Sequence, residues 1–518
     1  MLGLLNGAQL DFGVNWIAHL QRIGLTYLLV GAVDRNASAF LAHAKVPCFD
    51  YGVEAVQKLG LETDPAQPGG SADFVWGKEG WRRVVWLKVF VLEQIVDWGF
   101  SVVYSDADVI WLRDPLPLFD RHPHADLLFS TDHCFTKNGI GDDGLEVNAT
   151  MNNHNWNTGV YMLRRSPTTL SWVRAWRGMY ASAPTLLGLN GIQPAAYKLT
   201  RQGPTLPHAA DARLTTAWNG SLYLGIVPAF LFASGHTYTV QRLHERMGWP
   251  PIAMHLTWTY NGAAGKKARA RDAMLWFDGR GYYEQPSFVT VDLPAAPVGY
   301  NSWGRDREED MVQFHLSTLQ AQLAQATAGM AVAAALGRAF ISPKFTCFCE
   351  RMCPTDYLFE PGHFSDDPQT FGMPLDFREP TFLDNPRTPA AIKDSVLVIR
   401  PTLGLKCTDC VLEQQLDSGR TLVLVPPGLR DKALLRLLGP YASYRVWRLS
   451  LEGVGRPEQA FGGFSCASAA RQFDKRMEHI TGIWCCRWKE QAAKYQQPES
   501  VRLRMGLAYA SMPGLEDC

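Results

Sequence analysis

The sequence predicts two consecutive α/β domains. With 518 residues the chain exceeds the roughly 250–300 residues that one hydrophobic core serves. Hydrophobic residues make up 47% of it and charged residues 19%, so it has enough apolar side chains for packed cores. In both halves, short apolar runs typical of buried strands alternate with segments of helical periodicity, and this alternation is the pattern of α/β folds.

The first domain is expected to cover residues 1–293. Its first strand is predicted at Leu25–Ala32, a continuous apolar run of the kind found in buried parallel strands. A helix is predicted at Trp81–Trp98, where apolar residues recur at helical spacing, and Gly99 ends it before a strand at Ser101–Tyr104. The other predicted elements are helices at Ser38–Ala44 and Thr168–Tyr180, and strands at Val46–Phe49, Asp126–Ser130, Gly159–Leu163, Leu222–Val227 and Ile252–His255.

A linker is predicted at residues 294–309, which begin with Pro294, Pro297 and Gly299 within six positions. The second domain, 310–518, is smaller and has no assigned role. It opens with a long amphipathic helix from Asp310 to about Ala335. The other predicted elements are strands near Phe340 and at Val396–Ile399, Thr421–Val425 and Tyr444–Leu449, and helices at Val411–Leu416 and Arg430–Leu437.

Charge and hydropathy exclude several classes of protein. Lys and Arg together number 50, as do Asp and Glu, so the chain lacks the basic surplus of nucleic-acid binders and membrane-surface proteins. No run reaches the roughly 20 apolar residues of a membrane helix. The opening MLGLLNGAQLDFG also lacks the features of a signal peptide. We therefore expect this chain to be soluble, with any N-terminal anchor missing.

Eleven cysteines are present, nine of them at or beyond Cys347. The spacings Cys347-x-Cys349-x3-Cys353 and Cys407-x2-Cys410 are compatible with zinc or with disulfides. No close His completes a usual zinc set, and a lumenal setting favours disulfides. Asn-x-Ser/Thr sequons, which favour a secretory lumen, occur at Asn36, Asn148 and Asn219.

The most informative segment is Val102–Pro115, in which an apolar strand runs into Asp106-Ala107-Asp108 and then into a second apolar run. Carboxylates at the carboxyl end of a strand lie where open α/β sheets bind ligands. They suit a hard cation such as Mn²⁺ or Mg²⁺, which can bridge to the diphosphate of a sugar nucleotide. The alternative is a solvated acidic turn, which the apolar flanks disfavour.

A second candidate segment is Met254–Lys267. His255 closes an apolar run and could join the two carboxylates around the metal. Gly262 and Gly265 permit close backbone approach, and Lys266 supplies a point charge for phosphate. The alternatives are a structural histidine and a solvated Gly-Lys loop.

With these segments the sequence resembles the plant and algal extensin β-arabinofuranosyltransferases of glycosyltransferase family 77. The resemblance covers most of the chain. It implies a GT-A type, Rossmann-like nucleotide-diphospho-sugar transferase domain, an Mn²⁺-dependent UDP-sugar site, retention at the anomeric carbon, and a Golgi-lumenal enzyme anchored by an N-terminal helix. The residues that carry the resemblance are Trp16, His19, Leu20, 28–32, 105–117, 130–132, 157–160, 225–228, 234–238, 255–266 and 382–386.

The resemblance also implies roles for individual residues. Asp108 would be the principal metal ligand, Asp106 would reach metal or ribose, and His255 would be the third protein ligand. Lys266, with Gly262 and Gly265, would hold the diphosphate.

The other residues to which the resemblance assigns a role would contact the donor or the transferred sugar. Val30, Gly31 and Ala32, at the end of the first strand, would sit beside the uracil. Lys88 would approach the donor, although snorkelling would also explain a lysine on that helix face. Asp132 and Asn157, at strand ends, would face the transferred sugar, with local turn or capping roles as the alternative.

One stretch departs from the family. Members carry an Asp-Gln-Asn-Gly-Phe-Asn-Glu type motif on the helix that supports the reacting sugar, whereas this chain has Gly188–Pro194, without either carboxylate. A double displacement needs a nucleophile at the anomeric carbon, whereas front-face attack needs mainly leaving-group stabilisation, so the loss favours front-face attack.

The predicted function is a metal-dependent retaining glycosyltransferase that moves L-arabinofuranose from UDP-β-L-arabinofuranose to an arabinosylated, hydroxyproline-rich acceptor such as extensin. The alternatives are a catalytically weak or silent homologue that binds glycan or protein, and a transferase that uses UDP-galactose or UDP-xylose.

Overall fold

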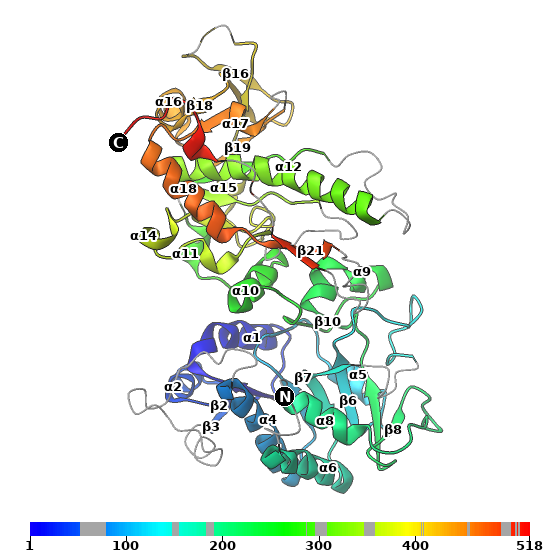
Figure 1. Cartoon of the computed structure of the whole chain (residues 1–518). Helices are drawn as coiled ribbons and strands as arrows, with labels where there is room; N and C mark the ends of the chain where they lie inside the picture. Colours follow the sequence, from blue (N-terminus) through cyan, green and yellow to red (C-terminus); the bar gives the residue numbers. More distant parts are fainter. Residues whose placement is uncertain are drawn as a thin grey trace. The chain divides into compact units, whose positions relative to one another are not determined.

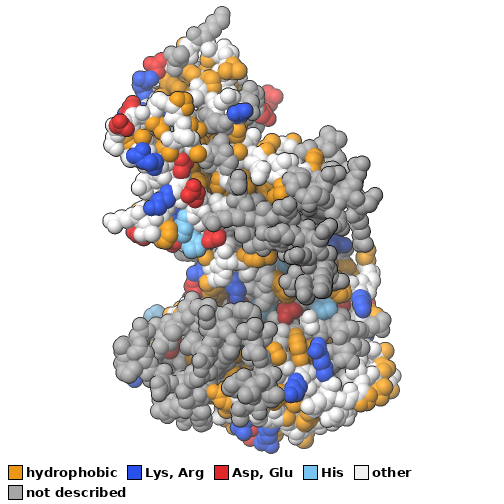
Figure 2. Space-filling model, viewed as in Figure 1, with side chains coloured by type: hydrophobic (Ala, Val, Ile, Leu, Met, Phe, Trp, Pro, Cys, Tyr) orange, Lys and Arg blue, Asp and Glu red, His pale blue; other side chains and the backbone are white. Residues whose placement is uncertain are grey.

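A computed structural model describes residues 1–51, 79–147, 155–182, 191–285, 287–295, 308–346, 358–405, 407, 409–452, 456–487, 499–502, 505 and 508–518. The chain divides into two compact units, Met1–Trp258 and Thr259–Cys518. In the part of the chain just given, no helix is long and apolar enough to cross a membrane. Basic and acidic side chains are interspersed on the face drawn in Figure 2, in keeping with the balanced composition.

Unit 1 is built on an eight-stranded mixed sheet in the order β3-β2-β1-β4-β7-β6-β9-β8 (Figure 1). Strands β1 to β4 are parallel, whereas β7 runs antiparallel to both β4 and β6. Each strand predicted for the first domain overlaps a strand of unit 1, and all of them except Ile252–His255 belong to this sheet. The strands are β1 (Leu2–Leu5), β2 (Leu29–Ala32), β3 (Cys48–Asp50), β4 (Val102–Ser105), β6 (Leu127–Thr131), β7 (Trp156–Leu163), β8 (Thr215–Ala217) and β9 (Leu222–Ile226).

From β1 the chain adds β2 and β3 on one side of the sheet, and it then places β4 on the other side of β1. The point between β1 and β4 is therefore a topological switch point, where doubly wound sheets open a crevice for ligands. The predicted first strand, at Leu25–Ala32, is therefore wrong in its rank and length. Leu2–Leu5 forms the first strand and pairs in register with Leu29–Ala32.

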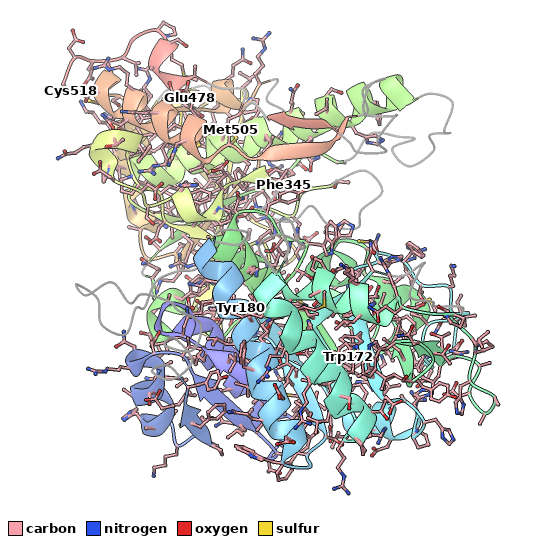
Figure 3. All side chains as sticks on the ribbon, turned by 60° about the horizontal axis from the view of Figure 1, so that its bottom comes forward. Trp172, Tyr180, Phe345, Glu478, Met505 and Cys518 are labelled. Atoms are coloured by element: carbon pink, nitrogen blue, oxygen red, sulfur yellow. A yellow bond between two sulfur atoms is a disulfide. The ribbon has the colours of Figure 1, made fainter. Side chains whose placement is uncertain are left out.

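Helices of unit 1 cover the sheet with apolar faces. Val85, Val89, Leu92 and Val96, predicted to share one face of α4, are all buried. Helix α6 packs against α4, and its Trp172, labelled in Figure 3, is buried in the same core. The helices are α1 (Leu10–Arg22), α2 (Arg35–His43), α4 (Glu79–Asp97), α5 (Leu116–Asp120), α6 (Pro167–Gly178), α8 (Ile192–Thr200) and α9 (Leu243–Met247).

A small second sheet crosses unit 1 in the order β10-β11-β5, with β10 at Phe232–Ser234, β11 at Ala253–His255 and β5 at Val109–Trp111. Strand β11 pairs antiparallel to β5. The segment that follows β4 is thereby joined to one that lies some 140 residues later in the sequence.

Unit 2 holds a seven-stranded sheet in the order β14-β13-β12-β19-β15-β17-β16, packed against the long helix α12 (Glu308–Ala335). The compact units divide at residue 258, ahead of the predicted linker at 294–309, because β12 pairs with β13 and β19 in this sheet. The strands are β12 (Phe288–Val291), β13 (Ala339–Ile341), β14 (Phe377–Arg378), β15 (Val396–Pro401), β16 (Leu412–Gln415), β17 (Thr421–Val425) and β19 (Val446–Leu449).

The helix predicted at Val411–Leu416 is wrong, because β16 is an exposed antiparallel edge strand paired with β17. The smaller strand pairs are β18 (Leu429–Arg430) with β20 (Phe461–Gly463), and β21 (Ile483–Arg487) with β22 (Glu499–Arg502). The other helices are α10 (Gly262–Asp272), α11 (Arg280–Tyr283), α14 (Pro368–Phe371), α15 (Ala390–Lys393), α16 (Asp431–Leu438), α17 (Pro457–Ala460) and α18 (Ala467–Ile480).

Among the described residues of unit 2, two disulfides close loops. Cys407 pairs with Cys410, which answers the zinc-or-disulfide question for that spacing in favour of a disulfide. Cys466 pairs with Cys518, the labelled C-terminal residue in Figure 3. The Cys347–Cys353 set lies outside the described residues.

Candidate functional site

Strand directions gather polar side chains at one edge of the unit 1 sheet. Asp106 follows β4 and Asp132 follows β6, and both strands run antiparallel to β7, so the start of β7 at Asn157 lies at the same edge. The Asp106 N–H donates to the Gly159 carbonyl at 2.8 Å, which fixes the turn after β4 against β7. The topology therefore brings these three predicted site residues to one place.

The pairing of β5 with β11 places His255 beside the turn that follows β4. In this register His255 lies opposite Val109, next to Asp108, and the Leu256 N–H donates to the Asp108 carbonyl at 3.1 Å. As a result the His255 Nε2 lies 3.3 Å from the Asp108 Oδ1.

One ligand atom each from Asp106, Asp108 and His255 lies within 4.8 Å of the other two. The side chains are 27%, 17% and 10% exposed, so the group is recessed yet open to solvent. Two carboxylate oxygens and one imidazole nitrogen make a donor set that suits Mn²⁺ or Mg²⁺.

Lys88 and Tyr104 converge on Asp106. The Lys88 ammonium lies 2.5 Å from the Asp106 Oδ1, and the Tyr104 hydroxyl donates to the same oxygen at 3.1 Å. Burial and the nearby Asp106 charge raise the pKa of the Tyr104 hydroxyl well above its usual value, so it stays protonated. Lys88 thus pairs with an acidic side chain of the cluster, and its approach to the donor stays a prediction.

Gly159 is a site residue that the sequence analysis did not single out. A Cβ at this position would lie 2.2 Å from the His255 Cε1 and 2.9 Å from both the Asp106 Oδ2 and the Asn157 Oδ1. Only glycine leaves room for those three side chains. A glycine inside an otherwise bulky strand is the sequence signal for such a close approach.

Asp132 is held by amide side chains. The Asn157 Nδ2 donates to the Asp132 Oδ1 at 2.9 Å, and the Gln193 Nε2 donates to the Asp132 Oδ2 at 3.1 Å. The Gln193 Oε1 accepts from the Thr158 N–H at 3.1 Å, which links α8 to β7. Gln193 belongs to the altered family motif, whose first residues, 188–190, lie outside the described residues.

A buried hydroxyl anchors the end of β4. Ser105 Oγ accepts from the indole N–H groups of Trp16 and Trp111, each at 2.9 Å, and donates to the Asp106 carbonyl at 2.9 Å. These bonds satisfy two buried donors and fix the backbone that carries Asp106.

Val30, Gly31 and Ala32 lie in β2, where all three are buried in the sheet. A Cβ on Gly31 would come within 2.5 Å of the Leu4 side chain and 2.9 Å of the Phe49 ring, so packing alone requires glycine here. The carboxyl end of β2 shares the edge that carries Asp106, because β2, β1 and β4 are parallel. Contact of these residues with uracil stays a prediction.

Gly262, Gly265 and Lys266 lie among the first five residues of α10, in unit 2. A Cβ on Gly265 would lie 1.6 Å from the Tyr260 carbonyl oxygen, so the local turn requires glycine. The approach of Lys266 to a diphosphate at Asp108 stays a prediction.

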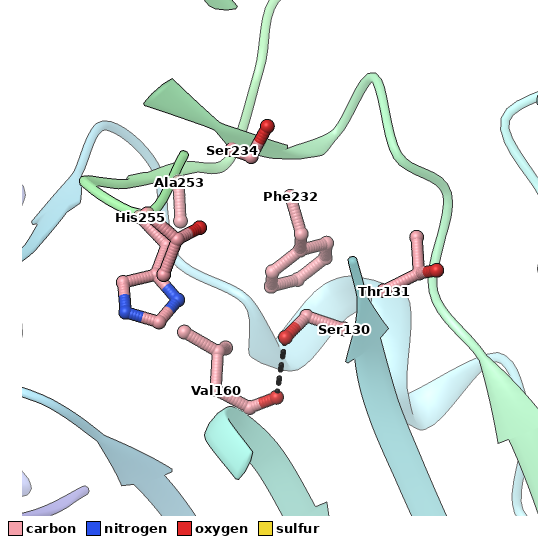
Figure 4. A pocket seen from close by; sticks show the side chains of 8 residues that line it. Ser130, Thr131, Val160, Phe232, Ser234, Ala253 and His255 are labelled. Carbon is pink, nitrogen blue, oxygen red and sulfur yellow. Dashed lines mark hydrogen bonds between the residues drawn. The ribbon is translucent and has the colours of Figure 1, made fainter. Parts of the chain in front are cut away.

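A small pocket in unit 1 is lined in part by His255, which it shares with the cluster (Figure 4). The His255 ring points into it beside Val160, and the Ser130 hydroxyl donates to the Val160 carbonyl at 2.9 Å. The other lining residues are Thr131, Phe232, Ser234, Ala253 and Thr257.

Comparisons with known proteins identify the family and the relatives that this chain resembles. Residues 23–269 match the nucleotide-diphospho-sugar transferase family. Arabinosyltransferase XEG113 of Arabidopsis thaliana is 26% identical over 501 residues, 93% of this chain and 73% of that protein. Beta-arabinofuranosyltransferase RAY1 of the same plant is 27% identical over 128 residues, 24% of this chain and 21% of that protein.

Among solved structures, the galactosyltransferase LgtC in complex with donor and acceptor sugar analogs is 12% identical, with a TM-score of 0.30 over 51% of this chain and 87% of that one. Mouse xyloside xylosyltransferase 1 is 14% identical, with a TM-score of 0.28 over 50% of this chain and 96% of that one.

Proposed function

Over residues 23–269 this chain belongs to the nucleotide-diphospho-sugar transferase family, and we propose that it transfers L-arabinofuranose from UDP-β-L-arabinofuranose to an arabinosylated, hydroxyproline-rich glycoprotein. The homology to an arabinosyltransferase along 93% of the chain supports the choice of sugar. The proposal includes a GT-A type catalytic domain, retention at the anomeric carbon and a Golgi-lumenal location.

The observation that carries the proposal is the cluster of Asp106, Asp108 and His255 at the topological switch point. The cluster fits a divalent cation, because its donor set is suitable and because Gly159, which has no side chain, lets His255 and the Asp106 carboxylate come close together. When bound, Mn²⁺ or Mg²⁺ would neutralise charge on the departing UDP. Asp106, Asp108 and His255 would hold it.

Lys88 is the first chain residue that the donor would meet beside these ligands. Its side chain is 13% exposed and its ammonium pairs with Asp106, so a phosphate oxygen can replace that carboxylate as its partner. The protonated Tyr104 hydroxyl keeps the Asp106 Oδ1 hydrogen-bonded when Lys88 turns away. Lys266, among the first five residues of α10, is the proposed second contact to the diphosphate.

Asp132 and Asn157 are proposed to face the transferred sugar and position it. Both Asp132 oxygens accept hydrogen bonds from amide side chains, which restricts the rotation of the carboxylate. A group held in this way suits sugar hydroxyls, which need oriented acceptors. The chemistry proposed is front-face attack by the acceptor hydroxyl, with stabilisation of the leaving group as the main catalytic term.

The altered motif at Gly188–Pro194 supports a second candidate function, a weak or silent homologue that binds glycan or protein. UDP release from UDP-β-L-arabinofuranose, measured with Mn²⁺ and with or without acceptor, separates the two. Release that requires acceptor and disappears in Asp108→Ala supports the transferase. No release from a folded protein that binds the donor supports the silent homologue.

The same assay with UDP-galactose and UDP-xylose tests the alternative donors. Restoring Gly188→Asp with Leu189→Gln should change transfer by less than about tenfold, or ~1.4 kcal/mol of barrier, if front-face attack operates. A silent parent that gains robust transfer from this double change would show that a catalytic group is missing.

A further inference from the structure

A second group of metal-ligating side chains lies wholly within unit 2, apart from the transferase cluster. His363 ends the 3₁₀ turn η5 (Pro361–His363), Asp366 follows it, and His479 lies in the last turn of α18. The His363 Nδ1 and the His479 Nε2 lie 2.6 Å and 2.7 Å from the same oxygen, Asp366 Oδ2. Two imidazoles therefore face one carboxylate oxygen.

Counting hydrogen-bond donors shows that a neutral His363 cannot satisfy both of its carboxylate neighbours. The other ring nitrogen of His363, Nε2, lies 3.1 Å from the Glu360 Oε2. A neutral imidazole has one N–H and an ionised carboxylate has none, so neutral His363 can donate to only one of its two carboxylate neighbours. Either a second proton or a metal ion must bring the other pair together.

We propose that His363, Asp366 and His479 bind a divalent transition-metal ion, with Zn²⁺ the best match. Two imidazole nitrogens and one carboxylate oxygen are ligands that Zn²⁺ accepts, with water in the fourth position. Glu360 then accepts the Nε2–H of His363 and leaves Nδ1 as the ligand atom, the carboxylate–histidine–metal arrangement that orients metal ligands.

The geometry is close to that of a loaded site. All three ligand atoms lie within 4.8 Å of one another. Ligands at about 2.0–2.1 Å from a tetrahedral ion lie about 3.3 Å apart, so His363 and His479 each need to move back from Asp366 by about 0.6 Å. The side chains of His363, Asp366 and His479 are 42%, 31% and 22% exposed, so an ion can reach them from solvent.

The backbone that carries these ligands is already fixed to α18. The buried guanidinium of Arg476, one turn before His479, donates to the carbonyls of His363 and Asp366 at 2.5 and 2.6 Å. The Phe371 ring stacks on the His479 ring at 4.0 Å between centroids. Helix α14, which carries Phe371, packs on α18 (Figure 1). The ligand side chains and their backbone are therefore largely in place before an ion binds. The bound ion would link the η5 segment to the end of α18.

The experiment uses the full chain carrying Asp108→Asn, so that the transferase cluster does not compete for metal. ZnCl₂ is titrated calorimetrically, and CoCl₂ is followed by visible absorption, because nitrogen and oxygen ligands give d–d bands without the charge-transfer band of a cysteine thiolate. We expect one tight site and a rise in the melting temperature with Zn²⁺, since an ion that binds only the folded state stabilises it.

The double variant His363→Gln/His479→Gln should lose that site. Glu360→Gln should weaken it by about 10- to 100-fold while leaving the ligands in place. The matched control is His43→Gln, an exposed histidine in the last turn of α2, which should change nothing. Absence of Zn²⁺ binding up to about 100 μM, a cobalt spectrum dominated by thiolate, or unchanged binding in both the double variant and Glu360→Gln would overturn the proposal. Glu360→Gln keeps the test valid if the double variant does not fold.

Discussion

Gly159→Ala tests the candidate transferase site with the smallest possible change, one methyl group. Gly159 lies in β7 without a positive φ, so alanine introduces no backbone strain. The new Cβ would lie 2.2 Å from the His255 Cε1, whereas two carbon atoms in contact are about 3.5 Å apart. The His255 ring must then move by about 1.3 Å.

A displacement of that size would remove His255 from the proposed metal site. Ligand distances at such sites hold to within about 0.2 Å, so a ring that has moved more than 1 Å no longer coordinates. Misplacement by about 1 Å costs on the order of 100-fold in rate, or about 2.7 kcal/mol of barrier. The same methyl group also crowds the Asp106 and Asn157 oxygens, each at 2.9 Å. We therefore expect a fall of about 100-fold in kcat/KM and a raised Mn²⁺ requirement.

The assay is transfer from UDP-β-L-arabinofuranose at several Mn²⁺ concentrations, with the melting temperature measured alongside. Gly178→Ala is the matched control, because no atom lies within 4 Å of its added Cβ, and it should keep parental activity. A Gly159→Ala protein with parental kcat/KM and an unchanged Mn²⁺ dependence would refute the assignment of His255 to the metal.

Asp108→Ala should lower transfer by at least about 1000-fold with an unchanged circular dichroism spectrum, because a charged metal ligand is lost; parental rates in Mn²⁺ would contradict this. Lys88→Met should raise the donor KM about tenfold, measured by initial rates, and Lys88→Arg should recover part of the loss; an unchanged KM would return Lys88 to a structural role. Ser105→Ala should lower the free energy of unfolding by about 2–6 kcal/mol in urea titrations, because two buried indole N–H groups lose their acceptor. The exposed Ser171→Ala is its control, and equal effects of the two would contradict this reasoning. Gln193→Ala should lower kcat about tenfold without changing the Mn²⁺ dependence, since its bonds orient a carboxylate outside the metal cluster; a changed Mn²⁺ dependence would contradict that separation.

The sequence located the elements that carry the site because local patterns there are strong. The helical spacing from Val85 to Val96 and the apolar run before Asp106 both formed the predicted elements. The family assignment, drawn from motifs spread along the chain, agrees with the match over residues 23–269.

Two elements were not predictable from local patterns. Strand β1 is only Leu2–Leu5, too short to show a period, and it is a strand because β2 and β4 pair with it on either side. The segment Leu412–Gln415 has residues that favour helix, yet it forms the edge strand β16, which pairs with β17. Pairing partners that are distant in sequence override propensity in both cases.

Residue types and their order determined, from sequence alone, an α/β chain with a carboxylate pair at a strand end and a histidine nearly 150 residues later. The tertiary structure alone decided that these groups meet, because that depends on the β5–β11 register and on the missing side chain of Gly159. The tertiary structure alone also decided that Lys88 pairs with Asp106 and that Gln193 donates a hydrogen bond to Asp132. A side chain's chemistry is local, whereas its neighbours are set by strand direction, register and packing, which join residues that the sequence keeps far apart.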